Sequence, residues 1–259
     1  MPKIESAFGS KAWVNNAFTS PPARVVKGRT RWTHRHAAWV AYLNRLAYVE
    51  SRGELIGLLA LEYLQKQGHV KRFKEQPFTT PLALWQEGLE ALSNRGSKEY
   101  TPDFMAEDTS GTKYVIEIKT ARYVTRAMEQ GFELWRDKFA EHDLKYLLWT
   151  DRDPLSRHLR QNLLRLRRAS AEYIEREEIS RLMDVLTSKG PLPVRALHAQ
   201  NLDLDLIAHA AWSGRVYLPL LEPITEQTLI TLKATEDLAA TLFAKEPDLD
   251  AWWNSLEAA

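Results

Sequence analysis

The segment that most constrains the fold is a short apolar stretch, Tyr114 to Ile118, which contains Glu117 and is followed by Lys119. Side chains alternate between the two faces of a strand, so Glu117 and Lys119 share one face while Ile116 and Ile118 occupy the other. Two charges are difficult to accommodate on a central apolar strand unless they line a site. The sequence therefore predicts a buried strand that ends at a functional site.

Asp103 lies in a second predicted strand, residues 99–106, within the sequence Tyr-Thr-Pro-Asp-Phe. The turn signal Asp-Thr-Ser-Gly at residues 108–111 separates this strand from the first and predicts an antiparallel pair, with Asp103 beside Glu117. Two carboxylates at adjacent strand ends would chelate a divalent cation, and the ammonium group of Lys119 would orient a water molecule or stabilise negative charge at phosphorus. The alternative is an exposed strand with a salt bridge, because Glu-x-Lys occurs about once by chance in a chain of this length.

Glu54 lies in the first turn of a predicted helix at residues 51–66. Ser51 and Glu54 match a capping box, in which the glutamate accepts a hydrogen bond from the backbone N–H of Ser51. Glu54 also shares a helical face with Leu58 and Leu61, which would aim it at the strands as a metal ligand. Both interpretations stay open from the residues alone, and two other acids on or next to this helix compete with it, Glu50 and Glu62.

The order of predicted elements defines the fold class. After an irregular arm at residues 1–36, the chain predicts helices at 37–49 and 51–66, strands at 70–79, 99–106 and 114–118, a helix at 123–142 and a strand at 145–150. This order is typical of an α/β protein with a mixed sheet flanked by helices.

Beyond about residue 152 the pattern becomes mainly helical. Helices are predicted at residues 155–168, 177–188, 193–200 and 204–213, followed by strands at 216–221 and 228–233. Three helices followed by a hairpin are typical of a winged helix. The sequence therefore predicts three parts: a basic arm over residues 1–36, an α/β domain over residues 37–151 and a winged-helix-like α+β domain over residues 152–259.

The net charge of +1 conceals an uneven distribution. Residues 1–50 carry +6, residues 152–168 hold six arginines and one acid, and residues 234–259 carry −5. This asymmetry favours polyanion binding at the basic stretches and a protein partner at the acidic end, although arginine-rich helices can also simply face water. In the arm, four cations surround Trp32 and are candidates for contacting a DNA backbone: Lys27, Arg29, Arg31 and Arg35.

Composition excludes several classes of protein. The chain has no cysteine, which rules out a disulfide scaffold, a thiolate metal site and a cysteine nucleophile, and which suits a cytoplasmic protein. Any metal must be held by oxygen or imidazole ligands, which favours hard ions such as Mg²⁺. The longest apolar run, residues 55–61, is far too short to span a membrane, and no Gly-rich ATP-binding loop is present.

Four segments in order carry a resemblance to a known family: Ser51-Arg52-Gly53-Glu54, Val-Lys-Arg-Phe-Lys-Glu-Gln-Pro at residues 70–77, Tyr100-Thr101-Pro102-Asp103-Phe104 and Val115-Ile116-Glu117-Ile118-Lys119. Together they resemble the PD-(D/E)xK nuclease superfamily and, within it, the TnsA-like endonuclease subunits of heteromeric transposases. The similarity covers about residues 49–151. It implies a restriction-endonuclease-like fold.

The resemblance also implies a site and partners. Glu54, Asp103 and Glu117 would bind Mg²⁺, for which Mn²⁺ would substitute, Lys119 would assist the attacking water, and Gln76 would be an auxiliary residue at the edge of the site. The nuclease would cut the non-transferred strand of double-stranded DNA at the 5′ ends of a transposon. An integrase-type transposase subunit would cut and join the 3′ ends, and the C-terminal domain would contact a regulatory ATPase.

Two other functions fit the same residues. One is a free-standing restriction or repair endonuclease that uses the winged helix to recognise its site. The other is a non-catalytic DNA-binding or assembly module that kept the fold, although the presence of Glu54, Asp103, Glu117 and Lys119 argues against it.

Overall fold

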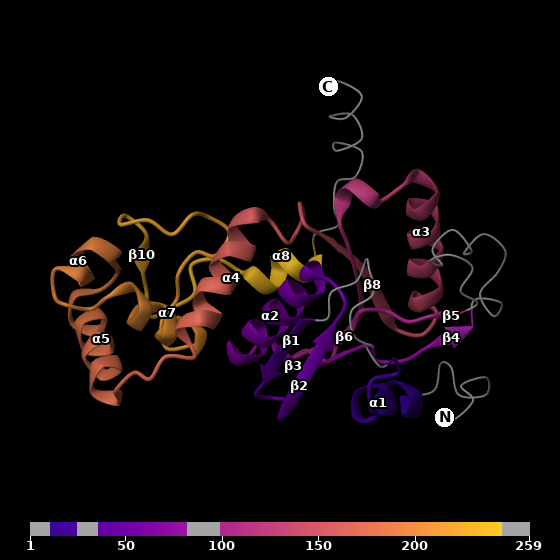
Figure 1. Ribbon diagram of the computed structural model, residues 1–259, viewed down its shortest axis with the longest axis horizontal. Coiled ribbons are helices and arrows are strands. Elements are labelled where there is room, and N and C mark those ends of the chain that lie inside the picture. Colours follow the sequence, from indigo (N-terminus) through magenta and orange to yellow (C-terminus); the bar gives the residue numbers. More distant parts are fainter. Residues whose placement is uncertain (1–10, 25–35, 82–98, 245–259) are drawn as a thin grey trace, which may run out of the picture.

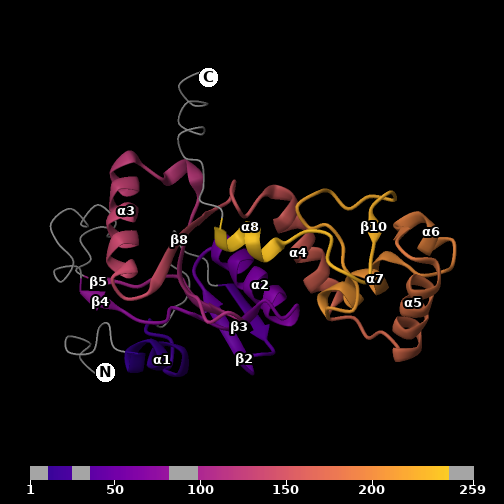
Figure 2. The same ribbon diagram turned by 180° about the vertical axis from the view of Figure 1, so that it is seen from behind.

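The computed structural model describes residues 11–24, 36–81 and 99–244. Its centre is a four-stranded mixed sheet with helices packed against both faces, and a smaller, mainly helical C-terminal part lies beside it (Figures 1 and 2). The predicted α/β architecture is therefore confirmed. Within the described residues, no helix combines the length and apolarity that a membrane crossing requires.

The sheet has the order β3–β6–β7–β8. Strand β3 (Val70–Glu75) is antiparallel to β6 (Phe104–Asp108), β6 is antiparallel to β7 (Lys113–Lys119), and β7 is parallel to β8 (Leu144–Thr150). The turn at residues 108–111 joins β6 to β7 with Phe104 opposite Ile116, as the turn signal predicted. A separate short pair is formed by β4 (Thr80–Pro81) and β5 (Glu99–Tyr100).

The two faces of β7 pack against different helices. Ile116 and Ile118 belong to the apolar cluster that includes α2 (Arg52–Lys66), whereas Val115 belongs to the cluster that includes α3 (Arg126–Ala140). Helix α2 lies very close to β7 because Gly57 has no side chain, and a methyl group there would overlap the Cδ1 atom of Ile118. The alternation predicted from the sequence thus sets which face each helix covers.

Helix α1 (Lys11–Thr19) is held against β3 by a buried lysine. The Lys74 ammonium donates hydrogen bonds to the carbonyl oxygens of Ala17, at 2.8 Å, Pro21, at 3.2 Å, and Ser20. Burial lowers the pKa of Lys74 to about 8, because the charged ammonium is shielded from water. Three carbonyl acceptors take the place of that water and fix the segment that follows α1.

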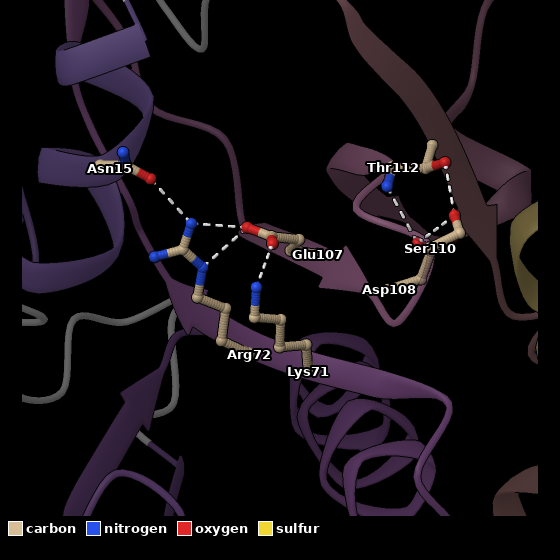
Figure 3. Close-up of polar contacts among 7 residues, drawn as sticks. All are labelled: Asn15, Lys71, Arg72, Glu107, Asp108, Ser110 and Thr112. Carbon is tan, nitrogen blue, oxygen red and sulfur yellow. Dashed lines mark hydrogen bonds and ion pairs between the residues drawn. The ribbon is translucent and has the colours of Figure 1, made fainter.

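A second set of polar contacts links β3, β6 and α1 (Figure 3). The Glu107 carboxylate accepts hydrogen bonds from Lys71, at 3.0 Å, and from the Nε atom of Arg72, at 2.8 Å, and Arg72 also donates to Asn15 at 2.8 Å. Burial raises the pKa of Glu107, but the hydrogen bonds from Arg72 and Lys71 outweigh burial and lower the pKa below its ordinary value. The pair of strands is therefore tied together at the end of the sheet farthest from Asp103.

Figure 3 also shows the turn that joins β6 to β7. The Asp108 carboxylate accepts hydrogen bonds from the hydroxyl of Ser110, at 2.6 Å, and from the backbone N–H of Thr112, at 2.9 Å. Gly111 adopts a φ of 89°, which suits a residue without a side chain. This local chemistry explains why the turn signal was legible in the sequence.

Residues 37–49, predicted to be helical, instead form a hairpin of β1 (His36–Val40) and β2 (Arg45–Val49). Along both strands, burial rises and falls with a period close to two, so Val40, Ala47 and Val49 are buried while Trp39 and Leu46 are exposed. Asn44 provides the turn with a φ of 49°. The helix prediction was wrong because the apolar residues of this segment also fit a helical period.

Two predicted strands are shorter than expected. Strand β3 ends at Glu75, because Gln76 has a φ of 44° and Pro77 follows it. The predicted strand at residues 99–106 is divided into β5 and β6 by Thr-Pro-Asp, where Pro102 lacks the N–H that a sheet needs. Strands β3 and β6 nevertheless pair directly with each other.

The C-terminal part is built from short elements. They are α4 (Arg157–Ala169), α5 (Arg176–Lys189), β9 (Leu192–Pro193), α6 (Val194–His198), α7 (Leu204–Trp212), β10 (Leu229–Ile230) and α8 (Leu238–Ala244). The strands predicted at residues 216–221 and 228–233 make a single bridge, Tyr217 to Thr231, and β10 pairs with β9 instead. The hairpin prediction was therefore wrong in its extent, because the pairing of residues 216–221 with residues 228–233 is reduced to this one antiparallel bridge.

Helix α8, which was not predicted, returns to the α/β part. The ring of Phe243 stacks on Tyr114 with centroids 4.4 Å apart, and the Trp149 indole donates a hydrogen bond to the carbonyl oxygen of Leu242 at 2.9 Å. One buried apolar cluster includes residues from both sides of residue 151. The domain boundary at that residue stays a prediction, and the core continues across it.

Candidate active site

The predicted site residues meet where β7 ends, beside the first turn of α2. Asp103 directly precedes β6, and its carboxylate accepts a hydrogen bond from the backbone N–H of Ile118 at 2.7 Å. This bond places Asp103 between Glu117 and Lys119 on the neighbouring strand. The structure thus brings together the three residues that the alternation of β7 and the turn at residues 108–111 predicted to be neighbours.

Glu117 is buried and held by two donors. The Lys119 ammonium donates a hydrogen bond to its Oε1 atom, and the Tyr100 hydroxyl donates one to its Oε2 atom at 2.8 Å. The Tyr146 hydroxyl lies 3.3 Å from that of Tyr100. Each oxygen of a carboxylate has two lone pairs, so Glu117 keeps acceptor capacity on both oxygens.

Glu54 is buried in the first turn of α2. The backbone N–H of Glu54 donates to the Ser51 hydroxyl at 3.0 Å, which confirms Ser51 as the N-cap. The second half of the predicted capping box differs, because the Glu54 carboxylate accepts from the N–H of Glu50, at 2.9 Å, rather than from that of Ser51. Glu54 therefore caps the chain before the helix and also faces the strands.

The electrostatics show that these four groups act on one another. Burial raises the pKa of Asp103 well above its ordinary value, and the negative charges of Glu117 and Glu54 raise it further. Burial alone would lower the pKa of Lys119, but Glu117, Asp103 and Glu54 outweigh burial and raise it. The site therefore combines a buried Asp103 that two neighbouring carboxylates act on with one lysine that stays protonated at neutral pH.

The donor atoms suit a hard divalent cation. In the part of the chain that the structure describes, no three histidine, aspartate or glutamate side chains lie close enough to form a complete metal-binding cluster. Mg²⁺ is usually held by only one or two carboxylates together with waters and substrate phosphates. Asp103, directly before β6, and Glu117, on β7, meet that requirement, and a cation there would offset the repulsion that Glu54 exerts on Asp103.

Gln76 contributes through its backbone. Its N–H donates to the carbonyl oxygen of Asp103 at 2.8 Å, and its own carbonyl oxygen accepts from Ala23 at 2.9 Å. Its side-chain amide is buried and has no hydrogen-bond partner among the described residues. The structure therefore places Gln76 next to Asp103, whereas Lys27, Arg29, Arg31 and Arg35 lie outside the described residues.

The sequence did not single out Tyr100 and Tyr146, which contact the site. Burial raises the pKa of both hydroxyls, so they remain protonated donors, and Tyr100 directs its proton to Glu117. The signal in the sequence was the position of Tyr100, three residues before Asp103. Interpreting that signal required the register of β5, which depends on its pairing with β4.

A cleft of about 600 Å³ lies elsewhere. Asp108, Tyr114 and Leu144 line it, and these residues mark the end of β6 and the starts of β7 and β8. Asp103, Glu117 and Lys119 lie at the opposite ends of the same strands. The cleft therefore does not belong to the carboxylate site.

Comparison with known proteins adds no assignment: the chain matches no model of a protein family, and it matches no curated protein. The functional interpretation accordingly depends on the geometry and chemistry of the site.

Proposed function

We propose that the chain is a magnesium-dependent DNA endonuclease. The observation that carries the proposal is the meeting of Asp103, Glu117 and Lys119 at the end of β7, within the electrostatic reach of Glu54. The negative charges of Glu117 and Glu54 raise the pKa of Asp103, a repulsion that a cation would relieve, and a protonated lysine beside them suits a reaction that develops negative charge on phosphate oxygens.

The residues of the chain have distinct roles in this proposal. Asp103 and Glu117 would hold Mg²⁺, which would supply Lewis-acid activation of the scissile phosphate. The N–H of Ile118 orients Asp103, and the hydroxyl of Tyr100 orients Glu117. Lys119, whose side chain is 27% exposed, can reach solvent, position the attacking water and stabilise the negative charge of the phosphate.

The particular role that we propose is cleavage of the non-transferred strand at the 5′ ends of a transposon. Support comes from the resemblance to TnsA-like endonucleases over residues 49–151 and from a sheet compatible with a restriction-endonuclease-like fold, in which β3, β6 and β7 are antiparallel and β8 is parallel to β7. An integrase-type transposase subunit would process the 3′ ends, and Mn²⁺ would substitute for Mg²⁺.

We further propose that the C-terminal part is winged-helix-like and contacts the regulatory ATPase. The order α5, β9, α6, α7 and β10, with β9 paired to β10, supports this interpretation. The bridge from Tyr217 to Thr231 would form the base of the wing.

The proposal is tested by Asp103→Ala and Lys119→Ala, with Lys113→Ala as the matched control at the other end of β7. Cleavage of transposon-end DNA is measured with Mg²⁺ and the partner recombinase, and folding is checked by circular dichroism. We expect both site variants to lose cleavage and the control to retain it. Cleavage at the wild-type rate by either site variant would refute the assignment, and specific cutting without any partner would favour a free-standing nuclease.

A further inference from the structure

A cleft of about 220 Å³ lies between α2 and α4, apart from the carboxylates. Helices α2 and α4 pack side by side along this boundary between the α/β part and the C-terminal part (Figures 1 and 2). The side chains that line the cleft are Arg52, Ile56, Arg157, Arg160, Gln161 and Leu164.

The lining of this cleft is strongly positive. Three of its six lining residues are arginines and none is acidic. Among the described residues, no acid forms an ion pair with Arg52, Arg157 or Arg160, and the buried Nε atom of Arg160 has no hydrogen-bond partner. Like charges brought together without an acid favour an anionic partner, and guanidinium groups match the geometry of phosphate oxygens.

The cleft opens next to the candidate active site. Arg52 is the first residue of α2 and precedes Glu54 by two positions, so both lie on the first helical turn while pointing in different directions. Arg157 is likewise the first residue of α4, after the capping Ser156. An anion held by these arginines would therefore lie at the same end of α2 as Glu54.

We propose that this arginine cleft (Arg52, Arg157 and Arg160) binds the phosphate backbone of the DNA duplex next to the scissile bond. The inference depends on the proposed nuclease function and gives the C-terminal part a role in holding substrate. Ile56 and Leu164 are the apolar lining residues and no aromatic ring is present, so the cleft offers no surface on which a base or a free nucleotide would stack. Contacts to phosphate fix the position of the duplex without reading its sequence.

The test compares two triple variants that remove the same charge. Arg52→Ala with Arg157→Ala and Arg160→Ala empties the cleft, whereas Arg176→Ala with Arg195→Ala and Arg215→Ala removes three exposed arginines elsewhere on the C-terminal part. Binding of the full-length chain to a DNA duplex is measured without metal over a range of salt concentrations. The cleft variant should bind about tenfold or more weakly at 0.1 M salt, and its salt slope should fall by about 0.9 for each phosphate that the arginines no longer neutralise.

A second variant covers the case in which removal of the partly buried Arg160 unfolds the protein. Arg52→Ala with Arg157→Ala changes only exposed side chains and should lower the salt slope by the amount expected for about two phosphates. Equal affinity and slope in the cleft variant and the wild type would overturn the inference, and so would an equally large decrease in affinity in the control variant. These outcomes are measured without cleavage: if the wild type binds DNA through these arginines but never cuts it, the proposed nuclease function fails, whereas the assignment of the arginine cleft as a site for backbone phosphates stands.

Discussion

Replacing Gly57 with alanine tests how closely α2 must approach the sheet. The added methyl group would overlap Cδ1 of Ile118 and lie 3.4 Å from the ring of Phe104, so α2 or Ile118 must move. Overpacking of this kind costs about 1–3 kcal/mol. Alanine in a helix interior gains about 1 kcal/mol over glycine, so the unfolding free energy should fall by about 0–2 kcal/mol.

The sign of this change should reverse when Ile118 is valine, because valine has no Cδ1 atom. Ile118→Val alone should cost about 0.5–1.5 kcal/mol. In that background Gly57→Ala should stabilise the protein, since the gain in helix propensity remains and the overlap is gone. Urea unfolding of the four proteins in this double-mutant cycle gives the coupling energy. Stabilisation by Gly57→Ala in the wild-type background would refute the close approach of α2 to β7.

Three further predictions concern charge, packing and metal. Glu107→Gln should lower the unfolding free energy by about 1.5 kcal/mol at pH 7, the low end for a charged hydrogen bond, because Lys71 is largely exposed. The pKa of Glu107 lies below its ordinary value of 4.5, so the wild type should lose its advantage over the variant as the pH falls below 4.5. Equal urea midpoints of the two proteins at pH 7 would contradict this prediction. Trp149→Phe should leave the buried carbonyl oxygen of Leu242 without its hydrogen-bond donor and lower the unfolding free energy by about 1–3 kcal/mol, measured by calorimetry. An unchanged melting temperature would show that this hydrogen bond contributes nothing to stability. Ca²⁺ should support DNA binding but not cleavage, because it accepts looser and longer coordination than Mg²⁺, whereas efficient cutting in Ca²⁺ or in excess chelator would exclude the metal mechanism.

The neighbouring positions of Asp103, Glu117 and Lys119 were predictable because they depend on local rules. Alternation along β7 placed Glu117 and Lys119 on one face, and the Asp108 turn set the register that brings Asp103 alongside. The position of Glu54 was open, since it depends on Gly57 and Ile118, which lie far apart in the sequence and meet only in the packed core.

Other features required tertiary structure for a different reason. The apolar residues at 37–49 fit both a helical and an extended period, and burial against α2 decides between them. The arginines of α4 were visible in the composition, but the arginine cleft exists only because α2 brings Arg52 to Arg157 and Arg160. Sequence patterns define neighbours within a hairpin, whereas contacts between separate helices depend on how the whole chain packs.

The return of α8 to the sheet has a consequence for the order of folding during synthesis. Strands β6 and β7 emerge from the ribosome early, but Tyr114 and Trp149 are covered only when Leu242 and Phe243 have been made. Domains usually fold in N-terminal to C-terminal order as they are synthesised. Here all four strands of the sheet have been made by Thr150, but the cluster that contains Tyr114 and Trp149 is completed only when α8 has followed, so the core of the α/β part depends on the last described helix of the chain.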